Sequence, residues 1–206
     1  MKDIFRGTLK WNYDDVVSHL ESRDRKLAAL IADIGPLDFK LQTDHFYSLV
    51  SAIISQQLST KAAATIKSRF VAGMGGKLEP ESILLYTKED LREFGISNQK
   101  ASYILDLSNH FVSDRGKFAN LSKMKDEDVI KTLIEVKGVG VWTAQMFLMF
   151  TLGRQDVFAP LDLGLKNAMI KLYGWKTLPD KEKLEKTALK WSPYRTLASL
   201  YLWRSL

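Results

Sequence analysis

The feature that most constrains this chain is a short glycine turn between two apolar segments, in the run LIEVKGVGVWTAQ at residues 133–145. Gly138 and Gly140 interrupt a pattern that is otherwise helical on both sides. Each glycine inside a helix would cost about 1 kcal/mol relative to alanine. The glycines therefore predict a tight turn that joins two helices, and not one continuous helix.

The rest of the chain also has helical periodicity, and alternation typical of strands is hard to find. Thr87 and Asp90 form a capping-box pattern, with Gly95 as the stop signal. Further helices are predicted after Thr43, Ser59 and Ser97, from Asp126, from near Asp162, and over 180–190 and 194–204. The sequence therefore predicts an all-α protein.

Composition excludes several classes of protein. The 206 residues include no cysteine, which excludes disulfides, thiolate catalysis and cysteine-ligated zinc or iron–sulfur clusters. His19, His45 and His110 are scattered without ligand spacing, so no metal site is predicted. The net charge of +6 is weak support for a polyanionic partner, because many basic proteins bind none.

The chain shows no sign of a membrane or secretory destination. It has no run of 18 apolar residues, and its start, MKDIFRGTLKW, lacks the apolar stretch of a secretory signal. We expect a soluble intracellular protein, located in the cytoplasm or nucleoid of a bacterium or archaeon, or in the nucleus of a eukaryote.

A Gly-x-Gly turn before a helix can bind a phosphate. Backbone N–H groups and the helix dipole attract the anion, and glycine lets a sugar–phosphate backbone approach closely. Val139 would fill the space between the two helices, and Lys137 would add a mobile cation. The predicted DNA contacts at this turn are Lys137, Gly138, Val139, Gly140 and Thr143. For an isolated GVG, an ordinary interhelical turn is the favoured alternative.

Here the turn is accompanied by KGVGVWTA, LGRQDVFAPLDLGL and WSPYRTLASLYLW, and earlier by AIISQQLSTKAA and LREFGISNQKASYILDL. Together these segments, over about residues 45–204, resemble the helix-hairpin-helix DNA glycosylases, specifically the 3-methyladenine DNA glycosylase II branch. The resemblance implies two helical lobes with a DNA cleft between them. One lobe would contain 1–40 and 150–206, and the other 41–149 with the hairpin at 133–145.

The resemblance places the catalytic aspartate of the family at Asp162, which lies 22 residues after Gly140 (162 − 140). An aspartate at a helix N-terminus stays ionised readily, because the helix dipole favours negative charge. A fixed carboxylate can stabilise the positive charge that develops on deoxyribose, or orient and deprotonate the attacking water. Without the preceding hairpin, a simple helix N-cap would be the preferred interpretation of Asp162.

Aromatic residues suggest the substrate. Bifunctional relatives carry a lysine two positions after the second hairpin glycine, where this chain has Trp142, so the resemblance implies a monofunctional enzyme that uses water. Trp142 and Trp203 match pocket tryptophans that would attract a cationic alkylated purine. Only one of Tyr201 and Trp203 can face the pocket, because they are two residues apart on a helix. Met146 stands where some relatives have a tyrosine, which leaves the substrate range open.

The stretch SQQLST lies between two predicted helices. Gln57, with Leu58 beside it, matches the wedge of the family, which fills the gap left when a base is rotated out of the duplex. A helix connection stabilised by glutamine side chains and a Ser59 cap is an equally weighted alternative. Ser97, Gln99 and Lys100 are predicted phosphate contacts, although solvated helix ends have the same pattern.

The sequence thus predicts a monomeric, monofunctional glycosylase that hydrolyses the bond between deoxyribose and an alkylated purine, of the 3-methyladenine or 7-methylguanine type, in duplex DNA during base excision repair. No cofactor is predicted, although a structural monovalent cation at the hairpin carbonyls is compatible with the resemblance. One alternative is a noncatalytic helix-hairpin-helix DNA-binding module. Another is a glycosylase for other base lesions, which the absence of cysteine and of a hairpin lysine disfavours.

Overall fold

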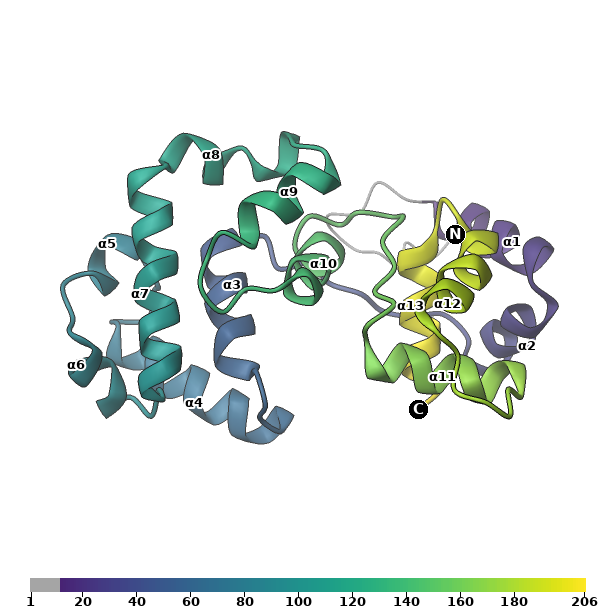
Figure 1. Cartoon of the computed structure of the whole chain (residues 1–206), viewed down its shortest axis with the longest axis horizontal. Helices are drawn as coiled ribbons and strands as arrows, with labels where there is room; N and C mark the ends of the chain where they lie inside the picture. Colours follow the sequence, from purple (N-terminus) through teal and green to yellow (C-terminus); the bar gives the residue numbers. More distant parts are fainter. Residues whose placement is uncertain (1–11) are drawn as a thin grey trace. The chain divides into compact units, whose positions relative to one another are not determined.

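A computed structural model describes residues 12–206, so the start of the chain that bears on a secretory signal lies outside the described residues. Every secondary-structure element between Asn12 and Leu206 is a helix, which confirms the predicted all-α class (Figure 1). No helix in this range is long and apolar enough to cross a bilayer. The chain divides into two compact units, with boundaries after Leu41 and after Phe147.

The first unit contains the described residues up to Leu41 and then Leu148–Leu206. Its helices are α1 (Tyr13–Arg23), α2 (Arg25–Ile34), α11 (Leu163–Tyr173), α12 (Lys181–Ala188), the 3-10 helix η2 (Leu189–Trp191) and α13 (Arg195–Arg204). Helix α13 packs against α2, α11 and η2. Its Tyr201 is fully buried, whereas Trp203 is half-buried, so the two residues face different environments as expected.

Asp24 joins three elements of the first unit. One carboxylate oxygen caps α2 by accepting from the amides of Lys26 and Leu27, at 3.1 and 3.3 Å. The other oxygen accepts from the hydroxyl of Tyr173 and, at 3.2 Å, from the indole of Trp191. Burial alone would raise the pKa of Asp24, but these hydrogen bonds outweigh it and lower the pKa. Asp24 therefore stays ionised in a largely apolar environment.

The second unit spans Gln42–Phe147. Its helices are α3 (His45–Ser55), α4 (Thr60–Gly73), α5 (Pro80–Ile83), α6 (Lys88–Glu93), α7 (Asn98–Ser113), α8 (Arg115–Ala119), the 3-10 helix η1 (Leu121–Lys123), α9 (Asp126–Leu133) and the first part of α10 (Val141–Phe150). Helix α7 contacts α3, α5, α6 and α8, and Figure 1 shows it running through this unit. It carries the fully buried Ile104 and Leu107.

Most predicted helix starts are confirmed. Ser59 caps α4, Ser97 caps α7, and the Thr87–Asp90 capping box is present at α6. The prediction that Thr43 caps α3 is wrong by one residue, because the carboxylate of Asp44 accepts from the amide of Tyr47 at 2.9 Å. An aspartate caps a helix at least as well as a threonine, so the neighbouring acid takes the position.

Candidate functional site

Asp162 is the N-cap of α11, and its side chain is half-buried. Its Oδ1 accepts a hydrogen bond from the backbone amide of Leu165 at 2.7 Å. The same oxygen accepts from the indole Nε1 of Trp203, on α13, at 2.8 Å. The two donors and the positive end of the helix dipole hold this carboxylate in one orientation.

The approach of Trp203 to Asp162 depends on a glycine. A Cβ placed on Gly164 would lie 3.1 Å from Oδ1 of Asp162 and 3.1 Å from Cδ1 of Trp203. Any larger residue at this position would push the carboxylate and the indole apart by a few tenths of an ångström. This role of Gly164 was not predicted, because Trp203 lies 39 residues further along the chain (203 − 164).

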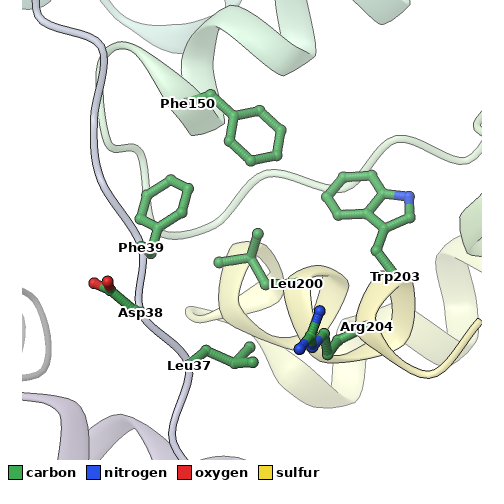
Figure 2. Close-up of a pocket in the computed structure, with 7 residues that line it drawn as sticks. All are labelled: Leu37, Asp38, Phe39, Phe150, Leu200, Trp203 and Arg204. Atoms are coloured by element: carbon green, nitrogen blue, oxygen red, sulfur yellow. The ribbon is translucent and has the colours of Figure 1, made fainter. Parts of the chain in front are cut away.

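An apolar cavity of about 420 Å³ lies beside Trp203. Figure 2 shows the rings of Phe39, Phe150 and Trp203 around it, with Leu200 between them and the carboxylate of Asp38 pointing away. The ring of Phe150 is 5.5 Å from that of Phe39 and 5.8 Å from that of Trp203. Phe39 and Phe150 were not predicted, because their sequence pattern does not distinguish a pocket wall from core packing.

Hydrogen bonds connect the loop before Asp162 to the start of α13. The guanidinium of Arg195 donates to both carboxylate oxygens of Asp156, at 2.6 and 3.0 Å, and to its backbone carbonyl at 2.9 Å. Thr196 donates its hydroxyl to the carbonyl of Arg154 at 2.6 Å and accepts from the amide of Val157 at 3.2 Å. These contacts were not predicted. They fix the path of the loop that leads to Asp162.

The hairpin between α9 and α10 has the predicted glycine turn. Gly138 has a φ of +80°, and a Cβ there would lie 2.1 Å from the ring of Tyr103. Glycine is therefore required at this position by both the backbone conformation and the neighbouring ring. A Cβ on Gly140 would meet nothing within 4 Å. The fold of the second unit therefore does not explain why residue 140 is a glycine, whereas a partner that approaches the backbone would explain it.

The remaining hairpin residues differ in accessibility. Lys137 is 70% exposed and pairs with Asp106 at 3.3 Å, and its amide donates to the same carboxylate at 2.9 Å. Val139 is 5% exposed, in agreement with its predicted filling role. Thr143 is also 5% exposed, so its side chain is buried, and its predicted contact with DNA stays a prediction. Trp142, the second residue of α10, is 42% exposed.

Met146 is half-buried further along α10. Trp142 and Met146 belong to the second unit, whereas Asp162 and Trp203 belong to the first. The structure therefore brings together one part of the predicted substrate site, the pair of Asp162 and Trp203. The role of Trp142 and Met146 in the same site stays a prediction.

The stretch between α3 and α4 presents Gln57 and Leu58 to the solvent. Gln57 has a φ of +57°, which makes it the one non-glycine residue of the described chain in the left-handed region. Such a conformation costs about 1–3 kcal/mol and is concentrated at functional sites. The predicted wedge residue is therefore held in a strained conformation.

The residues predicted to bind phosphate at the start of α7 are of two kinds. Ser97 and Gln99 are exposed, and Gln99 donates to the hydroxyl of Tyr103 at 2.6 Å. Lys100 instead turns inward, where its ammonium donates to the backbone carbonyls of Ile54 and Gln56 at 2.8 and 2.7 Å. Burial lowers the pKa of Lys100. The ammonium is therefore engaged within the protein, and its predicted contact with DNA stays a prediction.

No cluster of three or more histidine, aspartate or glutamate side chains with the spacing of a metal site occurs within residues 12–206. At the hairpin, the carbonyls of Leu133 and Val136 accept hydrogen bonds from the amides of Val136 and Val139, at 3.2 and 3.1 Å. A carbonyl oxygen has a second lone pair, so these groups are compatible with a monovalent cation, which stays a prediction.

Two features define the class of this protein. One is a glycine hairpin between two helices in the second unit, and the other is a carboxylate at a helix N-terminus beside an aromatic pocket in the first unit. Residues 50–193 match the HhH-GPD superfamily of base excision DNA repair proteins, and the chain belongs to this family.

Relatives and solved structures agree with this assignment. The alkylbase DNA glycosidase-like protein mag2 of Schizosaccharomyces pombe is 31% identical over 94% of this chain and 93% of its own length. The structure of a DNA-3-methyladenine glycosidase from Bacillus halodurans superposes with a TM-score of 0.82, at 38% identity, over 92% of this chain and 88% of that chain. The 3-methyladenine DNA glycosylase Mag1 of S. pombe, solved in complex with abasic DNA, gives a TM-score of 0.82 at 29% identity, over 93% and 96%.

Proposed function

We propose that this protein is a monofunctional DNA glycosylase, which hydrolyses the N-glycosidic bond of alkylated purines in duplex DNA and leaves an abasic site. The observation that carries the proposal is the carboxylate of Asp162, held by the indole of Trp203 and by the start of α11 beside an aromatic cavity. Relatives whose names assign them to 3-methyladenine excision support the same reaction.

Asp162 would act on the sugar. As the glycosidic bond lengthens, positive charge develops on the deoxyribose, and a fixed carboxylate nearby stabilises this charge more than it stabilises the substrate. The carboxylate can also orient the water that attacks the anomeric carbon and accept its proton. The hydrogen bond from Trp203 occupies Oδ1, so it fixes the direction in which the carboxylate faces its substrate.

The cavity beside Trp203 fits a purine base. Its volume of about 420 Å³ lies in the range of small-ligand pockets, about 300–1,000 Å³. Its wall is aromatic, and a purine methylated at N3 or N7 carries a positive charge that electron-rich rings attract. The same charge weakens the glycosidic bond, so a pocket without a strong general acid can be sufficient. We therefore place the excised base against Phe39, Phe150 and Trp203, with Trp142 and Met146 as further candidates for base contacts.

The hairpin would hold the DNA. The first amides of α10 and the open space at Gly140 suit one backbone phosphate, with Lys137 nearby. Leu161 and Leu163, which flank Asp162 in the chain, are each 69% accessible, and we expect a bound duplex to cover them. We expect the protein to act as a monomer on duplex DNA, in the cellular compartment that contains the chromosome.

The proposal is tested by incubating the wild-type protein with methylated duplex DNA and identifying the released bases chromatographically. Release of 3-methyladenine or 7-methylguanine, with an equal number of abasic sites, is the expected result. Duplex binding without release of any base would instead favour the alternative function, a noncatalytic helix-hairpin-helix module.

A further inference from the structure

Residues 55–58, between α3 and α4, form a type II β-turn without a glycine. Gln56 has φ −54° and ψ 129°, Gln57 has a φ of +57°, and the amide of Leu58 donates to the carbonyl of Ser55 at 3.2 Å. A type II turn requires a positive φ at its third residue, which is ordinarily supplied by glycine. Something outside the turn must therefore keep Gln57 in this conformation.

A type I turn is the unstrained alternative for these residues. The two turn types differ mainly in the orientation of the central peptide, here between Gln56 and Gln57, whose carbonyl points in nearly opposite directions in the two. The carbonyl of Gln56 accepts a hydrogen bond of 2.7 Å from the ammonium of Lys100. The same ammonium binds the carbonyl of Ile54, in the last turn of α3, at 2.8 Å. Lys100 thus forms a hydrogen bond with the peptide group between Gln56 and Gln57, whose orientation determines the turn type.

A second contact ties this turn to the hairpin. The side-chain amide of Gln56 donates to the carbonyl of Gly138 at 2.8 Å. Gly138 is the hairpin glycine that has a positive φ and lies too close to the ring of Tyr103 for a side chain. Gln56, the residue before the predicted wedge, is therefore held at its backbone by Lys100 and at its side chain by the hairpin.

From this geometry we infer that Lys100 is a positioning residue for base extrusion. It holds the turn at Gln56 in the type II form, and this conformation directs Gln57 into the duplex when a base is rotated out. The inference rests on the proposed function, because it assumes that Gln57 fills the gap in the DNA. It replaces the expectation that Lys100 contacts a phosphate.

The test is a double-mutant cycle between Lys100→Met and Gln57→Ala, with excision measured in single turnovers on a lesion in a normal base pair. Each single change should slow excision about tenfold, because the gap left by the extruded base is no longer filled. The double variant should be no slower than either single variant, because Gln57 is already misplaced when Lys100 is absent. Losses that multiply would overturn the inference.

Two controls separate positioning from charge. Lys131→Met removes an exposed lysine of the same unit and should leave excision, and the effect of Gln57→Ala, unchanged. The slope of log Kd against log salt should be the same for Lys100→Met and the wild type. A slope smaller by about one would mean that Lys100 neutralises a phosphate, and would overturn the inference.

A third control varies the substrate. A lesion opposite an abasic analogue needs less energy for extrusion, so on this DNA Lys100→Met should lie within about threefold of the wild type. An equal loss on both substrates would overturn the positioning role. If Lys100→Met does not fold, as judged by thermal melting, Lys100→Gln, whose shorter side chain lacks the ammonium, enters the same cycle with the same expected non-additivity.

The wild-type protein keeps the two proposals distinguishable. If it releases no alkylated base, the proposed function fails. If it releases base but the cycle is additive, only the role of Lys100 fails. A structure of Lys100→Met adds a readout independent of catalysis, in which the φ of Gln57 should become negative, and a retained positive φ would contradict the inference.

Discussion

The indole Nε1 of Trp203 lies 2.8 Å from Oδ1 of Asp162, although the two residues are separated by 41 positions in the chain. The hydrogen bond joins the last helix of the first unit to the start of α11. Trp203 therefore does more than line the proposed base pocket, because the same side chain also fixes the orientation of the Asp162 carboxylate.

Trp203→Phe should lower the single-turnover excision rate about 10- to 100-fold. Phenylalanine keeps a ring against Phe150 but removes the donor to Asp162, and a hydrogen bond to a charged group is worth about 1.5–3 kcal/mol. The rate is measured on duplex DNA with a single alkylated purine. Trp175→Phe, a change at a half-buried tryptophan of the same unit, is the matched control, and equal rates for the two variants would contradict the role of the hydrogen bond.

Gly164→Ala should lower activity although alanine favours a helix by about 1 kcal/mol over glycine. The new methyl group would press on Asp162 and Trp203, and small displacements of catalytic groups cost activity, here about tenfold. Excision rate and melting temperature are measured together. Gly116→Ala, where the methyl group would meet nothing within 4 Å, should leave the rate unchanged. A Gly164→Ala variant with full activity would show that the carboxylate tolerates the shift.

The two hairpin glycines should respond differently to alanine. Gly138→Ala should destabilise the fold by at least about 1–3 kcal/mol, because its φ is +80° and the methyl group would collide with Tyr103. Gly140→Ala should melt close to the wild type but bind duplex DNA about tenfold more weakly, because the methyl group would occupy the space that the phosphate needs. Chemical denaturation measures the free energy of unfolding, and fluorescence anisotropy measures the affinity for duplex DNA. Unchanged DNA affinity in Gly140→Ala would remove the hairpin from the interface.

The contact between Arg195 and Asp156 should appear in the pH dependence of stability. Burial alone would raise the pKa of Asp156, but hydrogen bonds from Arg195 and Ser192 outweigh it and lower the pKa. Because the folded pKa is below the unfolded one, the carboxylate stabilises the fold above a pH of about 4, and this contribution disappears as the pH falls through the folded pKa.

Asp156→Asn should therefore lower the free energy of unfolding by about 1–3 kcal/mol at neutral pH, and by much less near a pH of about 3. Denaturant unfolding at a series of pH values over this range gives the free energy of unfolding as a function of pH. Asp33→Asn, at an exposed position of α2, is the control. Its free energy of unfolding should change with pH in the same way as that of the wild type. A constant difference between Asp156→Asn and the wild type at every pH would contradict an ionised Asp156 as the source of the stabilisation.

The sequence predicted those parts of the molecule that depend on local pattern. Ser59 and Ser97 cap their helices because a hydroxyl near a helix start meets amides two or three residues away, and such spacing is visible in one chain. The glycine hairpin was predictable for the same reason. The role of Gly138 against Tyr103 was not, because the ring comes from a helix far earlier in the chain.

The contacts that order the site are non-local, and this limited what the sequence could reveal. Lys100 has the pattern of a solvated lysine at a helix start, yet its ammonium binds a carbonyl 44 positions away. Phe39 and Phe150 look like ordinary core residues, and only the fold places them beside Trp203. Asp162 itself looks like a helix cap, and it is one. Its proposed catalytic role came from its combination with the hairpin motif.

The catalytic role of Asp162 is tested by comparing the wild type with Asp162→Asn for release of free base from methylated duplex DNA, with duplex affinity measured on the same samples. Asparagine can still accept the hydrogen bonds from Leu165 and Trp203 but carries no charge. The wild type should release 3-methyladenine, and Asp162→Asn should release it at least about 100-fold more slowly while it binds duplex DNA with similar affinity. Equal release by both proteins would contradict a catalytic role for the Asp162 carboxylate.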